Sequence, residues 1–306
     1  MNNTSSVLSP VQPSQSTVVN VSPYVVSADI QVLLSKWASD RGFILPNGDF
    51  FPELRAEFCV LMRSVFPQFI LISEQEVSEG LAEIVAETRH PLLSLERAYF
   101  KAPYQLEVSR CVNALNADVG LYARSGTPSL REQLAVLCAA GVKTVSIVDD
   151  VIFSGGFLLR ILELLKKSGI TVATVYTGIA IGSGMDKVRA QGYEIECVRS
   201  FPEVVDEVCE RDFFPGVPLC GRTLRGAQNI GIPYIAPFGL MKDWASIAPE
   251  HESAVSKRCV ELASLLFNEI GRMSERPVLC SDLERGVLGI PFSPIPFVAA
   301  LQEFVR

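Results

Sequence analysis

The sequence predicts an α/β fold in which helices flank a parallel sheet. Over residues 144–198, segments rich in β-branched residues alternate with segments of helical periodicity, an order typical of parallel β–α–β units. The chain has 306 residues, which is long enough to bury a substantial core. Hydrophobic residues make up 48% and charged residues 20%, a balance that indicates a globular protein.

The N-terminal residues divide into a polar tail and a helical segment. Residues 1–27 are rich in Ser, Thr, Asn, Gln and Pro, and such a segment cannot bury enough apolar surface to offset its ordering entropy, so we expect a flexible tail. Ser27 is then expected to cap a helix over 28–39. Helical spacing returns over 56–66, which completes an N-terminal helical segment over 28–68.

Residues 69–200 form the expected core. Short apolar runs predict strands over 69–73, 90–95 and 119–123. Periodicity favours helices over 80–88 and 106–115, and a polar loop over 74–79. The stretch 124–128 carries loop signals. Ser129 then begins another helix, with Glu132 as its capping-box partner.

The pattern is cleanest from residue 144 onward. It predicts strands over 144–148, 170–181 and 193–198, with helices over 158–167 and 185–191 between them. After residue 200 several prolines interrupt any long element, and helical patterns return over 251–273 and 296–305. We therefore expect residues 201–306 to be a largely helical C-terminal extension that packs on the sheet.

The stretch 144–157, T-V-S-I-V-D-D-V-I-F-S-G-G-F, carries the chemistry. Asp149 and Asp150 follow a buried strand, and ionised carboxylates accept hydrogen bonds from vicinal hydroxyls or from the water shell of a metal. Ser154, Gly155 and Gly156 then lead into a helix, whose free N–H groups and dipole favour a phosphate. One end of the motif suits a diol and the other a phosphate, and ribose 5-phosphate has both.

This stretch resembles the phosphoribosyl pyrophosphate (PRPP) motif of type I phosphoribosyltransferases. The resemblance implies a type I phosphoribosyltransferase-like parallel sheet and places the ribose hydroxyls on Asp149 and Asp150. It implies that the 5-phosphate is wrapped by Phe153, Ser154, Gly155, Gly156 and Phe157. The sequence departs from the family at Phe153 and Phe157, where members often have Thr.

The family also implies a reaction, a metal and two further loops. A nitrogen base displaces pyrophosphate from PRPP with Mg²⁺, which Asp149 and Asp150 would contact through water. The pyrophosphate loop would fall at 73–80 and begin with Ser73, Glu74, Gln75 and Glu76. A mobile loop over the site would be 124–128, with Arg124 or Lys101 as the cation on pyrophosphate. The run 233–244 resembles the C-terminal part of phosphoribosyltransferase-like proteins from bacterial conflict systems.

Several alternatives stay open at this point. The acidic pair is also compatible with a solvated turn, Glu74 and Glu76 with a solvated loop, and Arg124 and Lys101 with surface charges. Core packing is favoured for 233–244 over a base pocket, and a surface turn for 221–225 over an anion contact. Besides a phosphoribosyltransferase, the chain fits a non-catalytic PRPP or nucleotide-binding regulator, or a phosphoribosyl hydrolase or phosphorylase-like enzyme.

Composition excludes other classes. A formal net charge of −7 argues against nucleic-acid binding, and no apolar stretch is long enough to span a bilayer. The start of the sequence lacks a signal-peptide pattern, so we expect a cytoplasmic protein whose partners are PRPP and a small base. The 8 cysteines form no C-x-x-C pair and there are only 2 histidines, which predicts reduced thiols rather than zinc. A homodimer is left open.

Overall fold

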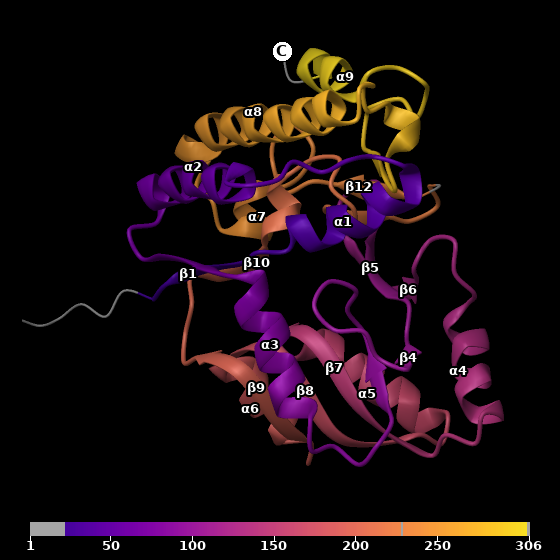
Figure 1. Ribbon diagram of the computed structural model, residues 1–306. Coiled ribbons are helices and arrows are strands. Elements are labelled where there is room, and N and C mark those ends of the chain that lie inside the picture. Colours follow the sequence, from indigo (N-terminus) through magenta and orange to yellow (C-terminus); the bar gives the residue numbers. More distant parts are fainter. Residues whose placement is uncertain (1–21, 228, 305–306) are drawn as a thin grey trace, which may run out of the picture.

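The computed structural model describes residues 22–227 and 229–304. It contains a parallel sheet with helices on both faces, drawn at the bottom of Figure 1 and called here the sheet lobe. The strand order is β4-β3-β7-β8-β9, and all pairs are parallel. The bounds are β3 (Leu92–Ser94), β4 (Tyr104–Gln105), β7 (Thr144–Ile152), β8 (Thr171–Ile181) and β9 (Glu194–Phe201). The predicted α/β fold with a parallel sheet is confirmed.

Helices cover both faces of this sheet. The helix α3 (Glu74–Val85) lies on one face, where its Val77 and Leu81 share a buried cluster with Val148 and Tyr176. On the other face are α4 (Leu130–Ala139), α5 (Gly156–Lys167) and α6 (Gly182–Arg189). Because both faces are covered, the strands carry long apolar runs rather than an alternating pattern.

The strand order reverses between β3 and β7. The chain continues from β3 to its outer neighbour β4, whereas from β7 it continues to β8 on the opposite side. The segments that follow β3 and β7 therefore diverge at the carboxyl edge of the sheet. Open parallel sheets bind ligands at such a point, because a crevice forms between the diverging segments.

A second parallel sheet, β10-β1-β2, corrects the prediction for the N-terminal tail. It consists of β1 (Tyr24–Ser27), β2 (Phe69–Ile72) and β10 (Asp206–Cys209). Residues 24–27 form the fully buried central strand and not a tail, and Ser27 does not cap a helix, since α1 (Ile30–Arg41) begins after Asp29. The polar composition of residues 1–21 hid this short strand; those residues lie outside the described part of the chain.

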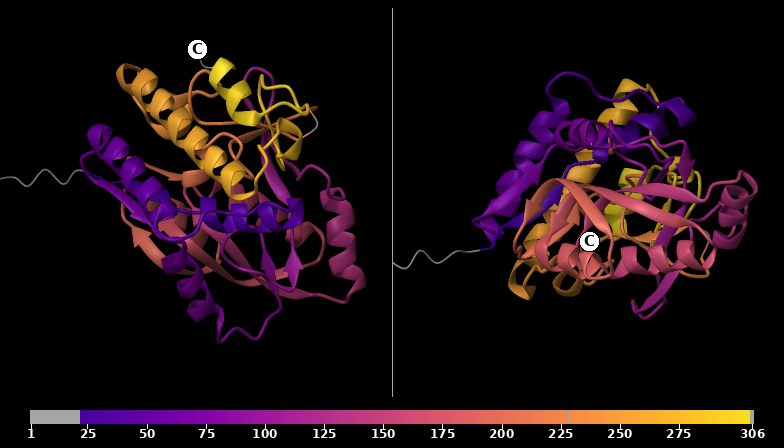
Figure 2. Two further views of the ribbon diagram at one scale, coloured as in Figure 1. Left: turned by 45° about the horizontal axis from the view of Figure 1, so that its top comes forward. Right: turned by 90° about the horizontal axis from the view of Figure 1, so that it is seen from below.

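The N-terminal segment and the C-terminal extension share one hydrophobic core, called here the helical lobe. Phe58 in α2 (Phe50–Val65) lies 5.4 Å and 5.6 Å, between ring centroids, from Phe213 and Phe214 of the extension. Figure 2 shows the N-terminal helices in indigo beside the C-terminal helices in orange and yellow. The other elements are η1 (Glu210–Phe213), α7 (Met241–Ala245), α8 (Pro249–Met273), η2 (Cys280–Asp282) and α9 (Phe297–Phe304). The domain bounds at 69 and 201 stay predictions.

A third sheet joins the two lobes, and its order is β13-β12-β11-β5-β6. The helix predicted over 106–115 is wrong, because Val108–Val112 form strand β5, which pairs with β6 (Asp118–Ala123) as a hairpin. β5 also pairs with β11 (Arg222–Leu224) of the extension, so pairing with a distant segment overrides local helical spacing. The remaining strands are β12 (Ile230–Ile232) and β13 (Gly286–Val287).

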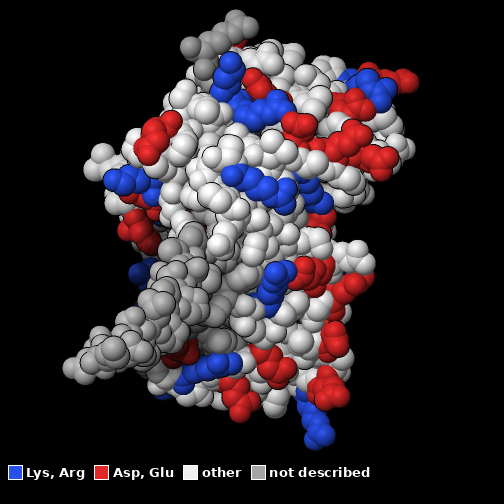
Figure 3. Space-filling model, turned by 90° about the vertical axis from the view of Figure 1, so that its left-hand side faces the viewer, with Lys and Arg blue, Asp and Glu red and all other residues white. Residues whose placement is uncertain are grey.

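Surface and thiol properties agree with the composition. Figure 3 shows one face on which acidic and basic side chains are mixed. Within residues 22–227 and 229–304, no helix combines the length and the apolar character that crossing a bilayer requires. All of the cysteines are free thiols.

Candidate active site

A cavity of about 530 Å³ opens where the segments after β3 and β7 diverge. Sheet-lobe residues form one side of it, and residues of β10, η1 and the loops of the extension form the other. Of the residues predicted from the sequence, six line it: Arg124, Asp149, Asp150, Phe153, Ser154 and Phe157. The structure thus gathers most of the PRPP-like motif around one space.

The two aspartates lie near the carboxyl end of the central strand. β7 extends to Ile152, so Asp149 and Asp150 lie within the strand and not in the predicted loop. Asp149 is only 4% exposed, whereas the Asp150 side chain is 22% exposed. Burial, with the neighbouring Asp150 carboxylate, raises the pKa of Asp149 well above its usual value. Asp150 is therefore the accessible member of the pair, and Asp149 lies behind it.

The glycine loop after β7 is fixed against the start of α6. Gly155 has a φ of 70°, and a Cβ added to it would lie 2.8 Å from the carbonyl oxygen of Gly184. A Cβ on Gly184 would lie 1.9 Å from the carbonyl oxygen of Phe153. Glycine is needed at both positions because the two backbones approach so closely.

This loop presents free donors at the N-terminus of α5. The amides of Ser154, Gly155 and Gly156 donate to no acceptor in the part of the chain that the structure describes, and the Ser154 side chain is exposed. Free amides at a helix N-terminus are suited to a phosphate. The guanidinium of Arg110 in β5 lies 5.0 Å from the ring centroid of Phe157, so a cation stands beside this loop.

The predicted pyrophosphate loop is wrong. Residues 74–76 begin α3 and form no loop, and Ser73 caps that helix by accepting from the Glu76 amide. None of Ser73, Glu74, Gln75 and Glu76 lines the cavity. Glu74 is bound to Arg55 at 2.7 Å. The error arose because β2, which precedes this stretch, belongs to the sheet of the helical lobe and not to the main sheet.

The segment that reaches the cavity is the one after β3. Leu95, Glu96, Arg97 and Ala98 line it. The Glu96 carboxylate accepts from the amides of Ala98, Tyr99 and Phe100, the last two at 2.8 Å and 2.7 Å. Burial raises the pKa of Glu96 to about 7, although these hydrogen bonds oppose the rise. This segment is thus folded around one of its own carboxyl groups.

Three arginines bring positive charge to the sheet-lobe side. Glu107 binds both Arg97 and Arg124, with Nε–Oε2 distances of 2.8 Å and 3.0 Å. Arg124 is largely buried, which lowers its pKa to about 10, so it is charged at neutral pH. Arg110 lines the cavity without an ion-pair partner among the described residues. Lys101 is exposed and does not line the cavity, and neither Gly155 nor Gly156 is among the lining residues.

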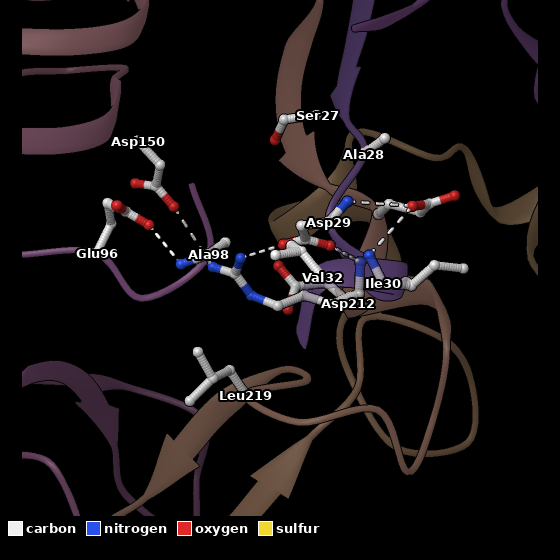
Figure 4. A network of polar contacts seen from close by, with 12 residues as sticks. Ser27, Ala28, Asp29, Ile30, Val32, Glu96, Ala98, Asp150, Asp212 and Leu219 are labelled. Atoms are coloured by element: carbon white, nitrogen blue, oxygen red, sulfur yellow. Dashed lines mark hydrogen bonds and ion pairs between the residues drawn. The ribbon is translucent and has the colours of Figure 1, made fainter. Parts of the chain in front are cut away.

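The sequence predicts that the extension 201–306 helps to form the acceptor pocket, but it did not point to Arg211. Arg211 from η1 binds Asp29, and its Nη2 lies 3.7 Å from Oδ2 of Asp150. Figure 4 shows these two acidic residues, Asp29 and Asp150, within one network of polar contacts. Arg222, Tyr234 and Trp244 also line the cavity, so the surface turn and the core packing favoured from sequence are incomplete accounts. The alternation of V-S-R-C-V was the available signal for Arg110, whereas the isolated Arg211 gave none.

Comparisons with known proteins agree with this geometry. Hypoxanthine/guanine phosphoribosyltransferase of Methanothrix thermoacetophila is 24% identical over 169 residues, covering 50% of this chain and 77% of that protein. The protein of the same name from Methanothermococcus okinawensis is 26% identical over 156 residues, covering 50% and 80%. Over about half of its length, this chain is therefore similar in sequence to hypoxanthine/guanine phosphoribosyltransferases. No protein-family model matches it.

Two solved structures show a weaker similarity to this chain than the curated proteins do. Adenine phosphoribosyltransferase from Thermoanaerobacter pseudethanolicus is 18% identical, with a TM-score of 0.29, covering 41% of this chain and 78% of that one. UMP synthase of Leishmania donovani is 16% identical, with a TM-score of 0.28, covering 43% of this chain and only 28% of that one.

The carboxylates of the cavity show which residues would contact a magnesium ion brought in by a phosphorylated ligand. Residues 22–227 and 229–304 contain no group of three or more His, Cys, Asp or Glu side chains able to hold a metal. Mg²⁺ normally keeps several waters and is held by one or two carboxylates together with substrate phosphates. Asp150, with Asp149 behind it, is the carboxylate placed to contact such an ion through water.

The shifted pKa of Glu207 predicts that the stability of the protein depends on pH. Burial, and then the nearby Asp150 carboxylate, raises the pKa of Glu207 from 4.5 to about 8. Between these two pKa values the folded state keeps a proton on Glu207 that the unfolded chain has released. The resulting stabilisation is complete below the unfolded pKa and is lost as the pH rises towards about 8. We expect the melting temperature to fall between about pH 5 and pH 8. Glu207→Gln should flatten this profile in thermal scans, and a variant profile as steep as that of the wild type would contradict the assignment.

Proposed function

We propose that this protein transfers the 5-phosphoribosyl group of PRPP to a nitrogen base and releases pyrophosphate. One observation carries the proposal: Asp150 and Ser154 line the same cavity at the edge of the same sheet, and Ser154 begins the glycine loop whose amides at 154–156 are free. Ribose 5-phosphate presents a diol to the first and a phosphate to the second.

The arrangement assigns a role to each group. Asp150 accepts hydrogen bonds from the ribose hydroxyls, while the loop amides and the Ser154 hydroxyl donate to the 5-phosphate. The acceptor nitrogen forms its bond to C1 as the bond from C1 to the diphosphate oxygen breaks, and the electron pair leaves with pyrophosphate. Positive charge grows on the ring near the carboxylates, and negative charge grows on a leaving group in the cavity that Arg124 lines, so both are stabilised electrostatically. Bound Mg²⁺ would neutralise diphosphate charge.

Calorimetry with PRPP and Mg²⁺ is the first test, and we expect saturable binding by the full chain. Pyrophosphate release is then measured with a panel of purine and pyrimidine bases. No binding of PRPP in the presence of Mg²⁺ would contradict the proposal.

Arg110→Ala tests the cation beside the glycine loop. A charge-assisted hydrogen bond to an anion contributes about 1.5–3 kcal/mol, so we expect roughly a tenfold or greater loss of PRPP affinity. Affinity for ribose 5-phosphate should fall by a similar factor, because Arg110 lies against Phe157 of the loop assigned to the 5-phosphate, which both ligands carry. Arg225→Ala is the matched control, because Arg225 is exposed, stacks on Tyr122 and does not line the cavity. A loss confined to PRPP would place Arg110 at the diphosphate instead.

A non-catalytic PRPP or nucleotide-binding regulator is the second candidate. Its support is that Arg211 already lies against Asp150, and that Phe153 and Phe157 add no hydroxyl to the phosphate loop. Binding of PRPP without pyrophosphate release for any base would favour it. Pyrophosphate release without any base would instead favour the hydrolase.

A further inference from the structure

The extension places a set of flat and polar side chains along the cavity. We call Asp206, Arg222, Tyr234, Asp243 and Trp244 the extension wall, since all of them line the cavity and belong to the extension. None belongs to the motif that holds the ribose phosphate. What this wall binds is a question separate from how the ribose is held.

Arg222 forms a planar platform. Its guanidinium carbon lies 4.5 Å from the Trp244 ring centroid and 5.6 Å from that of Tyr234, and its Nε donates weakly to the Tyr234 hydroxyl at 3.4 Å. Arg222 has no carboxylate within ion-pair distance among the described residues. A guanidinium supported by an indole on one side stacks well with a flat ring on its other side. The wall therefore suits a planar heterocycle.

Trp244 adds an unused donor. It is only 6% exposed, and the Cε3–Cζ3 edge of its ring packs so closely on Gly239 that a Cβ there would lie 2.9 Å and 3.0 Å from these atoms. Its Nε1–H donates to no acceptor within residues 22–227 and 229–304, and it is not among the buried polar atoms that lack a partner, so water or a ligand can reach it. This N–H is therefore available to a hydrogen-bond acceptor on a ligand in the cavity that Trp244 lines.

The two carboxylates of the extension wall are hydrogen-bond acceptors, whereas the Trp244 indole is a donor. Asp206 accepts from the Glu207 amide at 2.9 Å and from the Ser246 hydroxyl at 2.8 Å, which leaves lone pairs on both oxygens. Asp243 makes no side-chain hydrogen bond to a described residue and lies exposed at the rim. Both carboxylates require N–H donors on a ligand, and both repel carbonyl oxygens.

We infer that the acceptor is a flat nitrogen heterocycle with an exocyclic amino group. It stacks on Arg222, a ring nitrogen accepts from the Trp244 indole, and the amino group donates to Asp206 or Asp243. The inference rests on the proposed function for the place of the base beside the ribose. It separates amino-bearing bases from bases that carry only oxo groups, a distinction that the names of the relatives do not make for this chain.

Pairs of bases that differ by one group provide the test. Adenine and guanine are each compared with hypoxanthine, and cytosine with uracil, by calorimetry on the full chain with and without ribose 5-phosphate, and by pyrophosphate release from PRPP with Mg²⁺. In at least one pair we expect the amino-bearing base to be favoured roughly tenfold or more, as for a hydrogen bond to a charged group. Equal affinities, or a preference for the oxo member in every pair, would overturn the inference.

Three variants connect the result to the wall. The double variant Asp206→Asn, Asp243→Asn should reduce the preference to within about threefold, while the exposed Asp49→Asn serves as the matched control. Trp244→Phe keeps the ring and removes the N–H, so it should weaken base binding with PRPP affinity unchanged. If the wild type does not bind PRPP, that result contradicts the proposed function but not this inference. The base titrations without ribose 5-phosphate test this inference separately.

Discussion

The double variant Asp149→Asn, Asp150→Asn is expected to lose PRPP affinity by about a hundredfold or more while remaining folded. Two hydrogen bonds from hydroxyls to a carboxylate contribute about 1.5–3 kcal/mol each, and Asn does not replace an ionised acceptor. Calorimetry with PRPP and Mg²⁺ measures the loss, and circular dichroism with thermal scans checks the fold. Unchanged affinity would remove the ribose assignment.

The structure also predicts how this loss divides between the two positions. Asp149 is only 4% exposed, and its Oδ1 accepts from the Asp150 amide, a hydrogen bond that the side-chain oxygen of Asn can keep. Asp150 is the more exposed member, and Arg211 keeps Asp29 as a partner when the Asp150 charge is removed. We therefore expect Asp150→Asn alone to cause most of the loss and Asp149→Asn alone to cause little. Phosphate affinity, which depends on the glycine loop, serves as the internal control.

Gly184→Ala is expected to weaken binding of ribose 5-phosphate and PRPP at least tenfold, although residue 184 does not itself line the cavity. Its Cβ would lie 1.9 Å from the Phe153 carbonyl oxygen, and the glycine loop must move to relieve that contact. Overpacking of this kind costs about 1–3 kcal/mol, so the melting temperature should fall as well. Titration with ribose 5-phosphate measures the effect.

Ser183→Ala is the matched control for this variant. Ser183 precedes Gly184 on the same turn and is exposed, so its replacement should leave both affinity and melting temperature close to those of the wild type. If Gly184→Ala lowers the melting temperature but keeps full affinity, the position of this loop does not determine phosphate binding.

The sequence predicts correctly those features that depend on residues close together in the chain. The run 144–157 carries strand, carboxylates, glycines and helix in order, and the structure places that motif at the switch point of a parallel sheet. Most helices with apolar stripes were also predicted near their observed bounds, because burial of one face follows directly from spacing. The exceptions are α2 and α3, which begin at Phe50 and Glu74, whereas the predicted helices begin at residues 56 and 80. These features depend on neighbours a few positions apart.

The errors arose where pairing is distant. The tail predicted over 1–27 includes β1, which pairs with β2 and β10. The helix predicted over 106–115 includes β5, which pairs with β11. The pyrophosphate loop was assigned after β2 because no local signal distinguishes a strand of one parallel sheet from a strand of another. Arg211 could not be found for the same reason, since its partners Asp29 and Asp150 come from other parts of the chain.

The contact of Arg211 with Asp29, 182 positions earlier in the chain, and with Asp150 has a consequence for biosynthesis. A nascent polypeptide that has emerged only as far as the glycine loop holds the acidic pair but not the guanidinium beside it. Closing so long a loop is slow, since its entropy must be lost before the contacts that reward it can form. A ribosome-bound intermediate would therefore contain the residues proposed to bind the diol and the phosphate well before the extension completes the cavity. Ligand binding would then begin late in translation.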